Sequence, residues 1–338
     1  MLCRAASFSL ALLLYGQPVM AKMPPVPSPK PAQPAPAKAR DAKLARMPAK
    51  TLFKAARKGA ALTPASHGYY TRGCLAGGQR LAPDGPAWQA MRLSRNRNWG
   101  HPLTVAMIKR LAIDAKKNDG WAGLLVGDIS MPRGGPMRPS HASHQIGLDA
   151  DIWLTPMPSR TLTRTERERL SATFMLTSDQ LAVNPTVWTD AHAKLIKRAA
   201  SFREVERVLV HPAIKKELCL KAGKDRQWLG KVRPVRGHNY HFHIRFRCPP
   251  GSAGCRPQKP PTGDDGCGAE LDKWYKWLHA RLKPRPKPKV TVKPRKRKAR
   301  RLLTLTDLPP ACRLVLKAPD QIIAPQPRRA AQSRPAAN

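Results

Sequence analysis

Two short segments of this 338-residue sequence carry most of the side chains that could do chemistry. The first spans residues 140–153 (SHASHQIGLDADIW) and the second spans residues 237–248 (GHNYHFHIRFRC). Between them they concentrate imidazole and carboxylate groups, which bind metal ions and exchange protons near neutral pH. The candidate site residues are His141, His144, Asp151, His238, His241 and His243.

In the first segment, polar or amphipathic residues alternate with aliphatic ones from Leu148 to Leu154. A strand with this pattern sends Asp149 and Asp151 to the same face, because side chains alternate along an extended chain. Two carboxylates on one half-buried face repel each other unless a cation lies near them or one of them ionises less readily. We expect Gly147 to let the chain turn and bring His144 beside Asp151. A surface loop without chemistry is the alternative for this segment alone.

The second segment alternates between apolar and polar side chains, which is the period of a strand with one buried face. His241 and His243 would then stand side by side, close enough for one to hold a metal ion and the other to work on its bound water. An exposed strand face without chemistry would more often use Lys, Thr or Glu. The buried face would carry Tyr240, Phe242, Ile244 and Phe246, and the polar face His241, His243, Arg245 and Arg247.

His144, Asp151 and His243 together offer two nitrogens and one carboxylate, a set that leaves the fourth position of a tetrahedral site open for water. Neutral imidazole and carboxylate suit Zn²⁺, whereas the lack of a carboxylate cluster in the sequence argues against Ca²⁺ or Mg²⁺. Zinc lowers the pKa of bound water from roughly 15.7 to about 7 in favourable sites. The sequence contains neither HExxH nor GxSxG, so the common zincin and serine-hydrolase routes lack their signatures.

The elements that must position these residues follow from hydrophobic periodicity and from helix start and stop signals. Residues 104–117 place Ile108, Leu111 and Ala115 on one face, which predicts an amphipathic helix. Strands mixed with helices of this length predict an α+β fold, a single domain whose central antiparallel sheet carries the zinc site and is flanked by helices. The other predicted elements are strands at 124–131 and 205–210 and helices at 190–202, 212–222 and 269–282.

The N-terminus predicts a secretory signal peptide at residues 1–21. Arg4 precedes an apolar run of 11 residues, and Val19-Met20-Ala21 offers the small-x-small pattern that a signal peptidase accepts. The run is too short for a permanent transmembrane helix, and a buried N-terminal helix is the alternative. Cys3 lies before the run, whereas a lipoprotein anchor would follow it. We therefore expect export to the periplasm without a transmembrane anchor.

The rest of the chain divides into a globular middle and solvated ends. Seven of the thirteen residues from 24 to 36 are proline, so residues 22–50 are expected to form a disordered tether. Twelve of the twenty-one residues from 281 to 301 are Lys or Arg and none is acidic, so residues 283–301 are expected to be a disordered basic insertion. The predicted catalytic domain spans residues 51–282, followed after the insertion by a C-terminal segment at 302–316 and a disordered tail at 317–338.

Removal of Cys3 with the signal leaves six cysteines, an even number that suggests three disulfides in an exported chain. Sequence alone leaves fifteen pairings open, although the short spacing from Cys248 to Cys255 favours a local loop. The alternative, a cysteine zinc site, would need CxxC pairs, which the sequence lacks. The six are Cys74, Cys219, Cys248, Cys255, Cys267 and Cys312.

The net charge of +41 needs an account of its own. The charge would by itself keep the protein soluble, and nucleic acid is the usual partner of such a composition. Because the signal peptide predicts export, any contact with nucleic acid would be adventitious. No specific nucleic-acid partner is therefore expected. We expect electrostatic capture at the anionic cell envelope through the basic insertion, by peptidoglycan carboxylates or lipid phosphates.

At these residues the sequence resembles the penicillin-insensitive murein endopeptidases, within the wider group that contains lysostaphin, D-Ala-D-Ala peptidases and hedgehog domains. The similarity runs from about Tyr70 to Cys312. It is carried by MPRGGP at residues 131–136, HASH at 141–144, DADIW at 149–153, HFH at 241–243 followed by Arg245 and by Cys248-Pro249, and DDGCGAE at 264–270.

The resemblance implies that His144, Asp151 and His243 are zinc ligands. It implies that His241 is the catalytic histidine, that His238 assists the transition state, and that His141 is an active-site or accessory-metal residue. The disulfides that it implies are Cys74–Cys312, Cys219–Cys267 and Cys248–Cys255.

The implied reaction is hydrolysis of the D-alanyl to meso-diaminopimelyl cross-link of peptidoglycan by a zinc-activated water, without a serine nucleophile for β-lactams to block. A D,D-carboxypeptidase on the same scaffold would instead trim terminal D-alanine, and a zinc-stabilised cell-wall-binding module would not catalyse. Retention of His241 beside His243 favours an enzyme. The tether and the basic insertion are longer and more basic than this family leads us to expect, which concerns the binding context rather than the chemistry.

Overall fold

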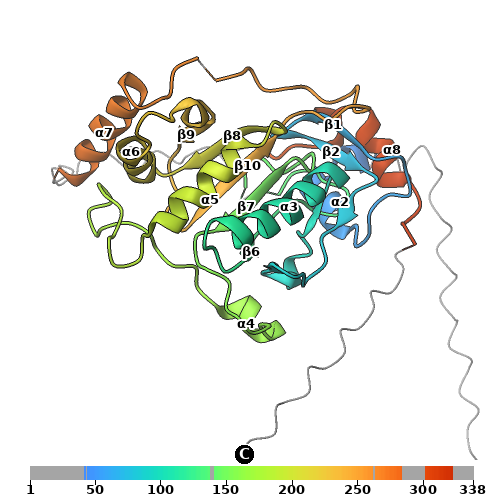
Figure 1. The fold of residues 1–338 in the computed structure, drawn as a ribbon. Helices are drawn as coiled ribbons and strands as arrows, with labels where there is room; N and C mark the ends of the chain where they lie inside the picture. The colour runs from blue at the N-terminus through green and yellow to red at the C-terminus, as the bar shows by residue number, and fades with distance from the viewer. Residues whose placement is uncertain (1–41, 43, 138–140, 262, 284–300, 323–338) are drawn as a thin grey trace, which may run out of the picture.

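The structure, a computed structural model, describes residues 42, 44–137, 141–261, 263–283 and 301–322. Within these residues the chain is α+β, with helices placed around a six-stranded mixed sheet (Figure 1), which confirms the predicted fold class. The predicted signal peptide and most of the tether, of the basic insertion and of the C-terminal tail lie outside the described residues. No helix in the described part of the chain is both long and apolar enough to span a membrane.

The central sheet has the strand order β4-β6-β7-β10-β8-β9. Its middle pairs are antiparallel, as predicted: β6 with β7, β7 with β10 and β10 with β8. The two outer pairs, β4 with β6 and β8 with β9, are parallel, so the sheet is mixed rather than wholly antiparallel. Its strands are β4 (Trp88–Ala90), β6 (Leu124–Val126), β7 (Asp149–Trp153), β10 (His241–Phe246), β8 (Val205–Val210) and β9 (Val232–Pro234).

One face of this sheet packs into the main hydrophobic core. Alternation along β7 and β10 buries Ala150 and Ile152, and Phe242 and Ile244, together with the apolar faces of two helices. These helices, α3 (Pro102–Asn118) and α5 (Asp190–Ser201), cross the sheet side by side (Figure 1). The opposite face of β7 and β10 is thereby left for the acidic and imidazole side chains.

The predicted elements recur with small changes of boundary. Strand β8 and helix α7 (Ala269–Leu282) agree with the prediction, and α6 (Pro212–Lys221) ends one residue earlier. The strand predicted at 124–131 is wrong beyond Val126, because the chain after it no longer pairs as a ladder strand. Gly127 donates its N–H to the carbonyl of Asp151, and Asp151 donates to that of Asp128. This irregular stretch brings the side chain of Asp128 to the site.

Short elements at the other end of the sheet form a second core. Helices α2 (Ala49–Ala55) and α8 (Ala311–Lys317) lie next to the hairpin of β1 (Ala65–Tyr69) and β2 (Arg72–Ala76) (Figure 1). Phe53 and Val315 are fully or almost fully buried there. The remaining elements are β3 (Gln79–Arg80), β5 (Trp99–Gly100), α4 (Arg164–Arg169), η1 (Leu93–Arg95), η2 (Gln227–Lys231) and η3 (Leu305–Asp307).

Three disulfides fasten these parts together. Cys74–Cys312 joins β2 to α8 across 238 residues of sequence, and Cys219–Cys267 joins α6 to the start of α7. Cys248–Cys255 closes a short loop after β10. These are the same three pairs that the family resemblance implies, and the first ties the C-terminal segment to the sheet.

Candidate metal centre

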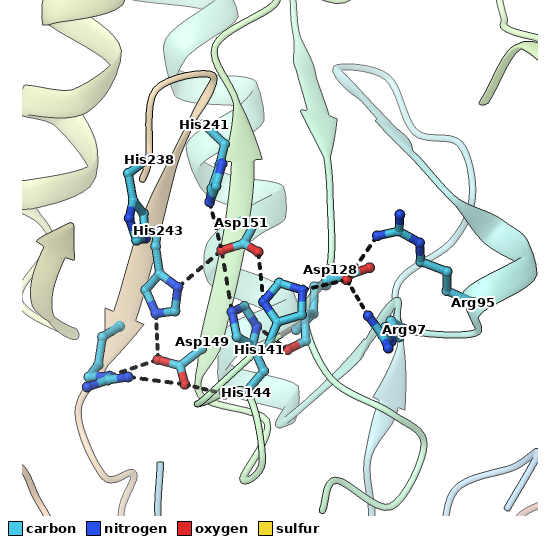
Figure 2. A network of polar contacts seen from close by, with 12 residues as sticks. Arg95, Arg97, Asp128, His141, His144, Asp149, Asp151, His238, His241 and His243 are labelled. Atoms are coloured by element: carbon cyan, nitrogen blue, oxygen red, sulfur yellow. Dashed lines mark hydrogen bonds and ion pairs between the residues drawn. The ribbon is translucent and has the colours of Figure 1, made fainter. Parts of the chain in front are cut away.

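The candidate site lies on the face of β7 and β10 that points away from the main core and from α3 and α5, which pack there. Pairing of the two strands sets His243 opposite Asp151, and His241 opposite Trp153. His141 and His144 come from the loop that precedes β7. The structure thus gathers in one cluster all six residues predicted for the site, His141, His144, Asp151, His238, His241 and His243 (Figure 2).

Asp151 is the centre of this cluster. Its Oδ1 lies 3.4 Å from Nε2 of His144 and 3.1 Å from Nδ1 of His243. Its Oδ2 lies 3.7 Å from Nδ1 of His141, and Oδ1 lies 3.7 Å from Nε2 of His241. The residue is only 5% exposed. Four imidazoles therefore approach one buried carboxylate.

In three of these imidazoles, the ring nitrogen that points away from Asp151 forms a hydrogen bond with an oxygen of the protein. Nδ1 of His144 donates to the carbonyl of Ile129 at 2.7 Å. Nε2 of His243 is 2.9 Å from Oδ1 of Asp149, and Nε2 of His141 is 2.8 Å from Oδ2 of Asp128. A carbonyl or carboxylate can only accept, so each of these nitrogens carries the hydrogen. The nitrogen that remains on each ring turns its lone pair toward Asp151.

Lone pairs aimed at a carboxylate repel it unless a proton or a metal ion lies between them. Burial alone would lower the pKa of His144, but the negative charges of Asp151 and Asp149 outweigh it and raise this pKa to about 9. Burial would likewise raise the pKa of Asp151, yet the surrounding histidines hold it well below its usual range. The cluster thus favours positive charge at its centre.

The three donors whose ligand atoms all lie within 4.8 Å of one another are His141, His144 and Asp151. His243, which was predicted as the third ligand, adjoins this group through Asp151. In a tetrahedral zinc site with bonds of about 2.0–2.1 Å, neighbouring ligand atoms are separated by roughly 3.3 Å. The distances of 3.4 Å from His144 and 3.1 Å from His243 to Asp151 match this spacing. Two of the three ligand separations that a zinc ion would need are thus present, and the imidazole and carboxylate donors have the chemistry that fits this ion.

The predicted repulsion between the two carboxylates of β7 is relieved by Arg245 of β10, which pairs with Asp149. Asp149 is fully buried and accepts from Nε of Arg245 at 2.8 Å and from the backbone N–H of His144 at 2.8 Å. Burial would raise the pKa of Asp149, but Arg245 and His243 outweigh it and lower the pKa far below the usual range. Asp149 is therefore a charged support of the site.

Asp128 belongs to the site although the sequence patterns did not single it out. Besides His141, its Oδ2 accepts from Arg97 at 2.8 Å and from Arg95 at 3.2 Å (Figure 2). Burial would raise its pKa, but the hydrogen bond and charge of His141, together with Arg97, lower it to about 2. A single aspartate in an irregular stretch has no spacing that could have revealed this role.

His241 and His238 lie at the rim of the cluster, with ring centroids 4.9 Å apart. Nδ1 of His241 is buried and has no hydrogen-bond partner among the described residues. Burial lowers the pKa of His241, and it lowers the pKa of His238 to about 3. A cavity of about 240 Å³ opens beside His241 and is lined also by Asp128, His141, Asp151, Trp153 and Tyr240. We call it the active-site cavity.

The loop that carries the histidines has a constrained backbone. His144 has φ of 67°, a left-handed conformation that is uncommon for a residue other than glycine. Gly147, expected to allow the turn, has φ of 72°, and a Cβ there would lie 2.9 Å from the backbone nitrogen of His101. Strain of this kind persists only where the surrounding contacts fix it, as the bonds of His144 to Ile129 and Asp149 do.

Comparison with known proteins adds an independent line of evidence. Residues 66–317 match the model of a family described as penicillin-insensitive murein endopeptidase. The protein of that name from Klebsiella pneumoniae is 44% identical to this chain over 211 residues, which cover 62% of this chain and 76% of the relative. The one from Haemophilus influenzae is 46% identical over 213 residues, which cover 62% and 72%.

The protein of the same name from Yersinia enterocolitica is 41% identical over 222 residues, which cover 66% of this chain and 80% of the relative. The family match includes both segments that carry the candidate site, and it includes the elements of the central sheet. This chain therefore belongs to the penicillin-insensitive murein endopeptidase family.

Proposed function

We propose that this protein is a zinc metallo-endopeptidase that hydrolyses D-alanyl to meso-diaminopimelyl cross-links in peptidoglycan. Membership of the family supports an endopeptidase that acts on murein. The observation that supports a metal ion is the orientation of three imidazoles. In each, one ring nitrogen is hydrogen-bonded to a protein oxygen and the other nitrogen faces Asp151. Histidines prepared in this way are typical of metal ligands.

The proposed ligands are Nε2 of His144, a carboxylate oxygen of Asp151 and Nδ1 of His243. His141, whose Nδ1 also turns to Asp151, is proposed as an accessory residue, because four protein ligands would close a tetrahedral site. A zinc ion bound there would polarise the scissile carbonyl and lower the pKa of a water molecule.

His241 is proposed to exchange the proton that hydrolysis requires. Its ring lines the active-site cavity, and Nε2 lies within reach of the cluster at 3.7 Å from Asp151. His238, whose ring lies next to that of His241, is proposed to assist by holding it in place and by stabilising charge in the transition state. The amine of the leaving group would take the proton from His241.

The cellular setting is part of the proposal. Residues 1–21 are proposed to direct export through the Sec route, so that the enzyme acts in the periplasm. Three disulfides support an oxidising compartment. The envelope is also where the peptide cross-links of murein are found.

The test is digestion of purified cross-linked muropeptide dimers and of uncross-linked monomers, read by chromatography and mass spectrometry. We expect cleavage of dimers, loss of cleavage in EDTA and recovery with Zn²⁺. Trimming of terminal D-alanine from monomers alone would instead indicate a D,D-carboxypeptidase. Zinc binding without cleavage of either substrate would indicate a binding module, and full activity in metal-free protein would contradict the mechanism.

A further inference from the structure

Two cavities are separate from the active-site cavity, and the charged residues that line them in the described chain are all Lys or Arg. One has a volume of about 780 Å³ and lies between α2 and the segment around η1. The other, about 730 Å³, lies between the turn of the β1–β2 hairpin and the start of the C-terminal segment. No Asp or Glu of the described chain lines either one. The cations that line them are Lys50, Lys54, Arg57, Arg72, Arg95, Arg97, Arg256 and Arg301.

The three cavities form a row, because neighbours share lining residues. Lys50 and Pro136 line both of the cationic cavities. Arg95 lines the nearer cationic cavity and the active-site cavity, and Arg97 reaches from the nearer cavity to Asp128. We call the two cationic cavities together the basic groove. It begins at the active-site cavity and leads away from it.

Most of the charge in the basic groove is not neutralised by the protein. Arg95 and Arg97 pair with Asp128, and Arg301 pairs with Asp307. Among the described residues no ion pair involves the remaining five side chains, which are those of Lys50, Lys54, Arg57, Arg72 and Arg256. Like charges that line a shared hollow repel one another and attract anions.

Four of these five cations do little for the fold. Lys54, Arg57, Arg72 and Arg256 are exposed, and the side chains of these residues make no hydrogen bond within the described chain. Repulsion among these like charges disfavours the folded state. A row of cations that begins beside the active-site cavity, most of them without an ion pair in the described chain, is therefore better explained by a ligand than by structure.

We propose that the basic groove binds the carboxylates of peptidoglycan stem peptides that lie next to the cross-link being cleaved. The identity of this ligand rests on the proposed function, because stem peptides of cross-linked murein carry free carboxylates beside the scissile bond. A polymer that presents anions at intervals suits a row of cavities better than a single small anion does. The groove would hold the strand while the cross-link enters the active-site cavity.

The experiment compares two triple variants of the full chain that remove the same charge. The groove variant is Lys54→Gln, Arg57→Gln and Arg72→Gln. The control variant is Lys117→Gln, Lys273→Gln and Lys276→Gln, three exposed cations that line none of these cavities. All proteins also carry His241→Ala, so that the wall is not cut during the measurement. Binding to purified sacculi is measured by sedimentation at low salt.

We expect the groove variant to bind sacculi about five- to tenfold more weakly than the control variant, from three lost charge contacts of the size found at protein surfaces. On sacculi whose carboxyl groups have been converted to neutral methylamides, the two variants should bind equally. Equal binding to native sacculi would show that net charge alone matters and would overturn the proposal. A groove-specific loss that persists on amidated sacculi would assign the groove to another anion, such as phosphate.

The binding result stands apart from the catalytic one. Failure of the wild-type protein to cleave dimers would contradict the proposed function, yet a groove-specific loss on native sacculi would still establish the groove as a carboxylate site. Both variants should also unfold at or above the wild-type temperature, because neither removes a contact that stabilises the fold.

Discussion

Among single residues, the metal centre depends as much on the groups behind the histidines as on the histidines themselves. Ile129, Asp149 and Asp128 each accept from the far nitrogen of one imidazole. Without such partners an imidazole can rotate or change tautomer, and its lone pair is then lost to the metal. The two ring nitrogens of His144 and His243 that turn to Asp151 are of opposite type, Nε2 and Nδ1.

Substitution of the proposed ligands should separate binding from catalysis. Asp151→Ala and His243→Ala should each lose zinc, because each removes a ligand. His241→Ala should retain about one zinc per chain and lose turnover by about 10²- to 10⁴-fold, the usual size of an acid–base contribution. Metal content and dimer cleavage, measured on the same samples, check both expectations. Release of zinc by His241→Ala would mean that the roles of His241 and His243 are exchanged.

His141→Ala distinguishes the two donor sets within the cluster. If His141 is an accessory residue, the variant keeps its zinc and loses only part of its activity. The closest donor group in the structure contains His141 rather than His243. Complete loss of metal in His141→Ala, with metal retained in His243→Ala, would assign the ion to that group.

Asp128 offers a prediction about a positioning residue. Asp128→Asn should keep its zinc and lower the activity by about 10-fold, because an amide no longer fixes the hydrogen on Nε2 of His141. Asp225→Asn, at an exposed carboxylate that pairs with Lys197, is the matched control. Competition with a chelator gives the affinity, and dimer cleavage gives the rate. Wild-type values for both in Asp128→Asn would show that Asp128 only balances Arg95 and Arg97.

The histidines of the site were predictable because strand alternation and short spacing gather them. Asp128 was not, because its place depends on the irregular backbone after β6 rather than on a repeating pattern. The sequence could not predict either that the closest group of donors contains His141 in place of His243, since this depends on side-chain orientation. The zinc ion and the role of each residue stay predictions.

Among the elements, two helices begin at the dipeptide His-Pro. His101 precedes α3 and His211 precedes α6, and Nδ1 of each accepts from the backbone N–H two residues later, at 3.2 Å and 3.1 Å. The proline lacks the N–H that would otherwise need a partner. These two histidines thus cap helices, and their imidazoles must be neutral to accept.

His211 gives the protein an acid-sensitive helix start. Burial lowers the pKa of His211 from 6.5 to about 4, so between these values the unfolded chain binds a proton that the folded chain does not. Stability should therefore fall as pH drops from 6.5 to 4, by up to about 3 kcal/mol from this residue. His211→Asn, which caps without titrating, should flatten that part of the stability curve.

Urea unfolding at several pH values, compared between wild type and His211→Asn, measures the difference directly. The comparison cancels the other histidines, whose titration is common to both proteins. Identical slopes of stability against pH between 4 and 6.5 would show that His211 is protonated in the folded protein without penalty.

Long periodic elements were predictable, whereas short ones were not. Helix α7 has a period near 3.6, and β8 is a short run rich in Val and Leu; the predicted bounds of both agree with the structure. Strands β3, β5 and β9 have two or three residues each, too few for a period to be recognised. The parallel outer pairs were missed for another reason, because the direction of strand pairing depends on chain connections that local pattern does not show.

At the scale of the whole molecule, the C-terminal segment is held by one buried arginine as well as by a disulfide. Nη1 of Arg133 donates to the carbonyls of Val315, Leu316 and Ala318 at 2.6–2.9 Å, and Nη2 pairs with Asp320. The carbonyls at the end of α8 would otherwise lack partners. Arg133 is part of the MPRGGP segment, so this segment joins the two ends of the domain.

Arg133→Ala should therefore lower the free energy of unfolding by about 2–3 kcal/mol, the cost of buried carbonyls left without donors. It should also make the segment after Arg301 easier to cleave with trypsin. Arg313→Ala, at an exposed arginine on α8 itself, should change stability by less than about 0.5 kcal/mol. Equal stability of the two variants would mean that the disulfide and the second core suffice to hold the segment.

The basic insertion is the remaining source of charge, and residues 284–300 of it lie outside the described residues. The expected role of this insertion as an electrostatic contact with the cell envelope must be separated from that of the basic groove. Arg301 belongs to the folded part, because its guanidinium pairs with Asp307 and lines the groove. A test of the basic insertion therefore has to leave Arg301 and the residues from there to Cys312 unchanged.

Replacement of every Lys and Arg in residues 284–300 by Ser keeps the length of the connection and leaves Cys74–Cys312 intact. Sacculus binding should weaken at low salt, and the difference from wild type should fade as the Debye length shortens to about 8 Å near 0.15 M. The kcat on a small soluble dimer should barely change, because the candidate site is formed by β7, β10 and the loop before β7. Loss of the disulfide would instead cost roughly 2–5 kcal/mol, which thermal unfolding would reveal. Unchanged binding at every salt concentration would leave the basic groove as the principal electrostatic contact with the wall.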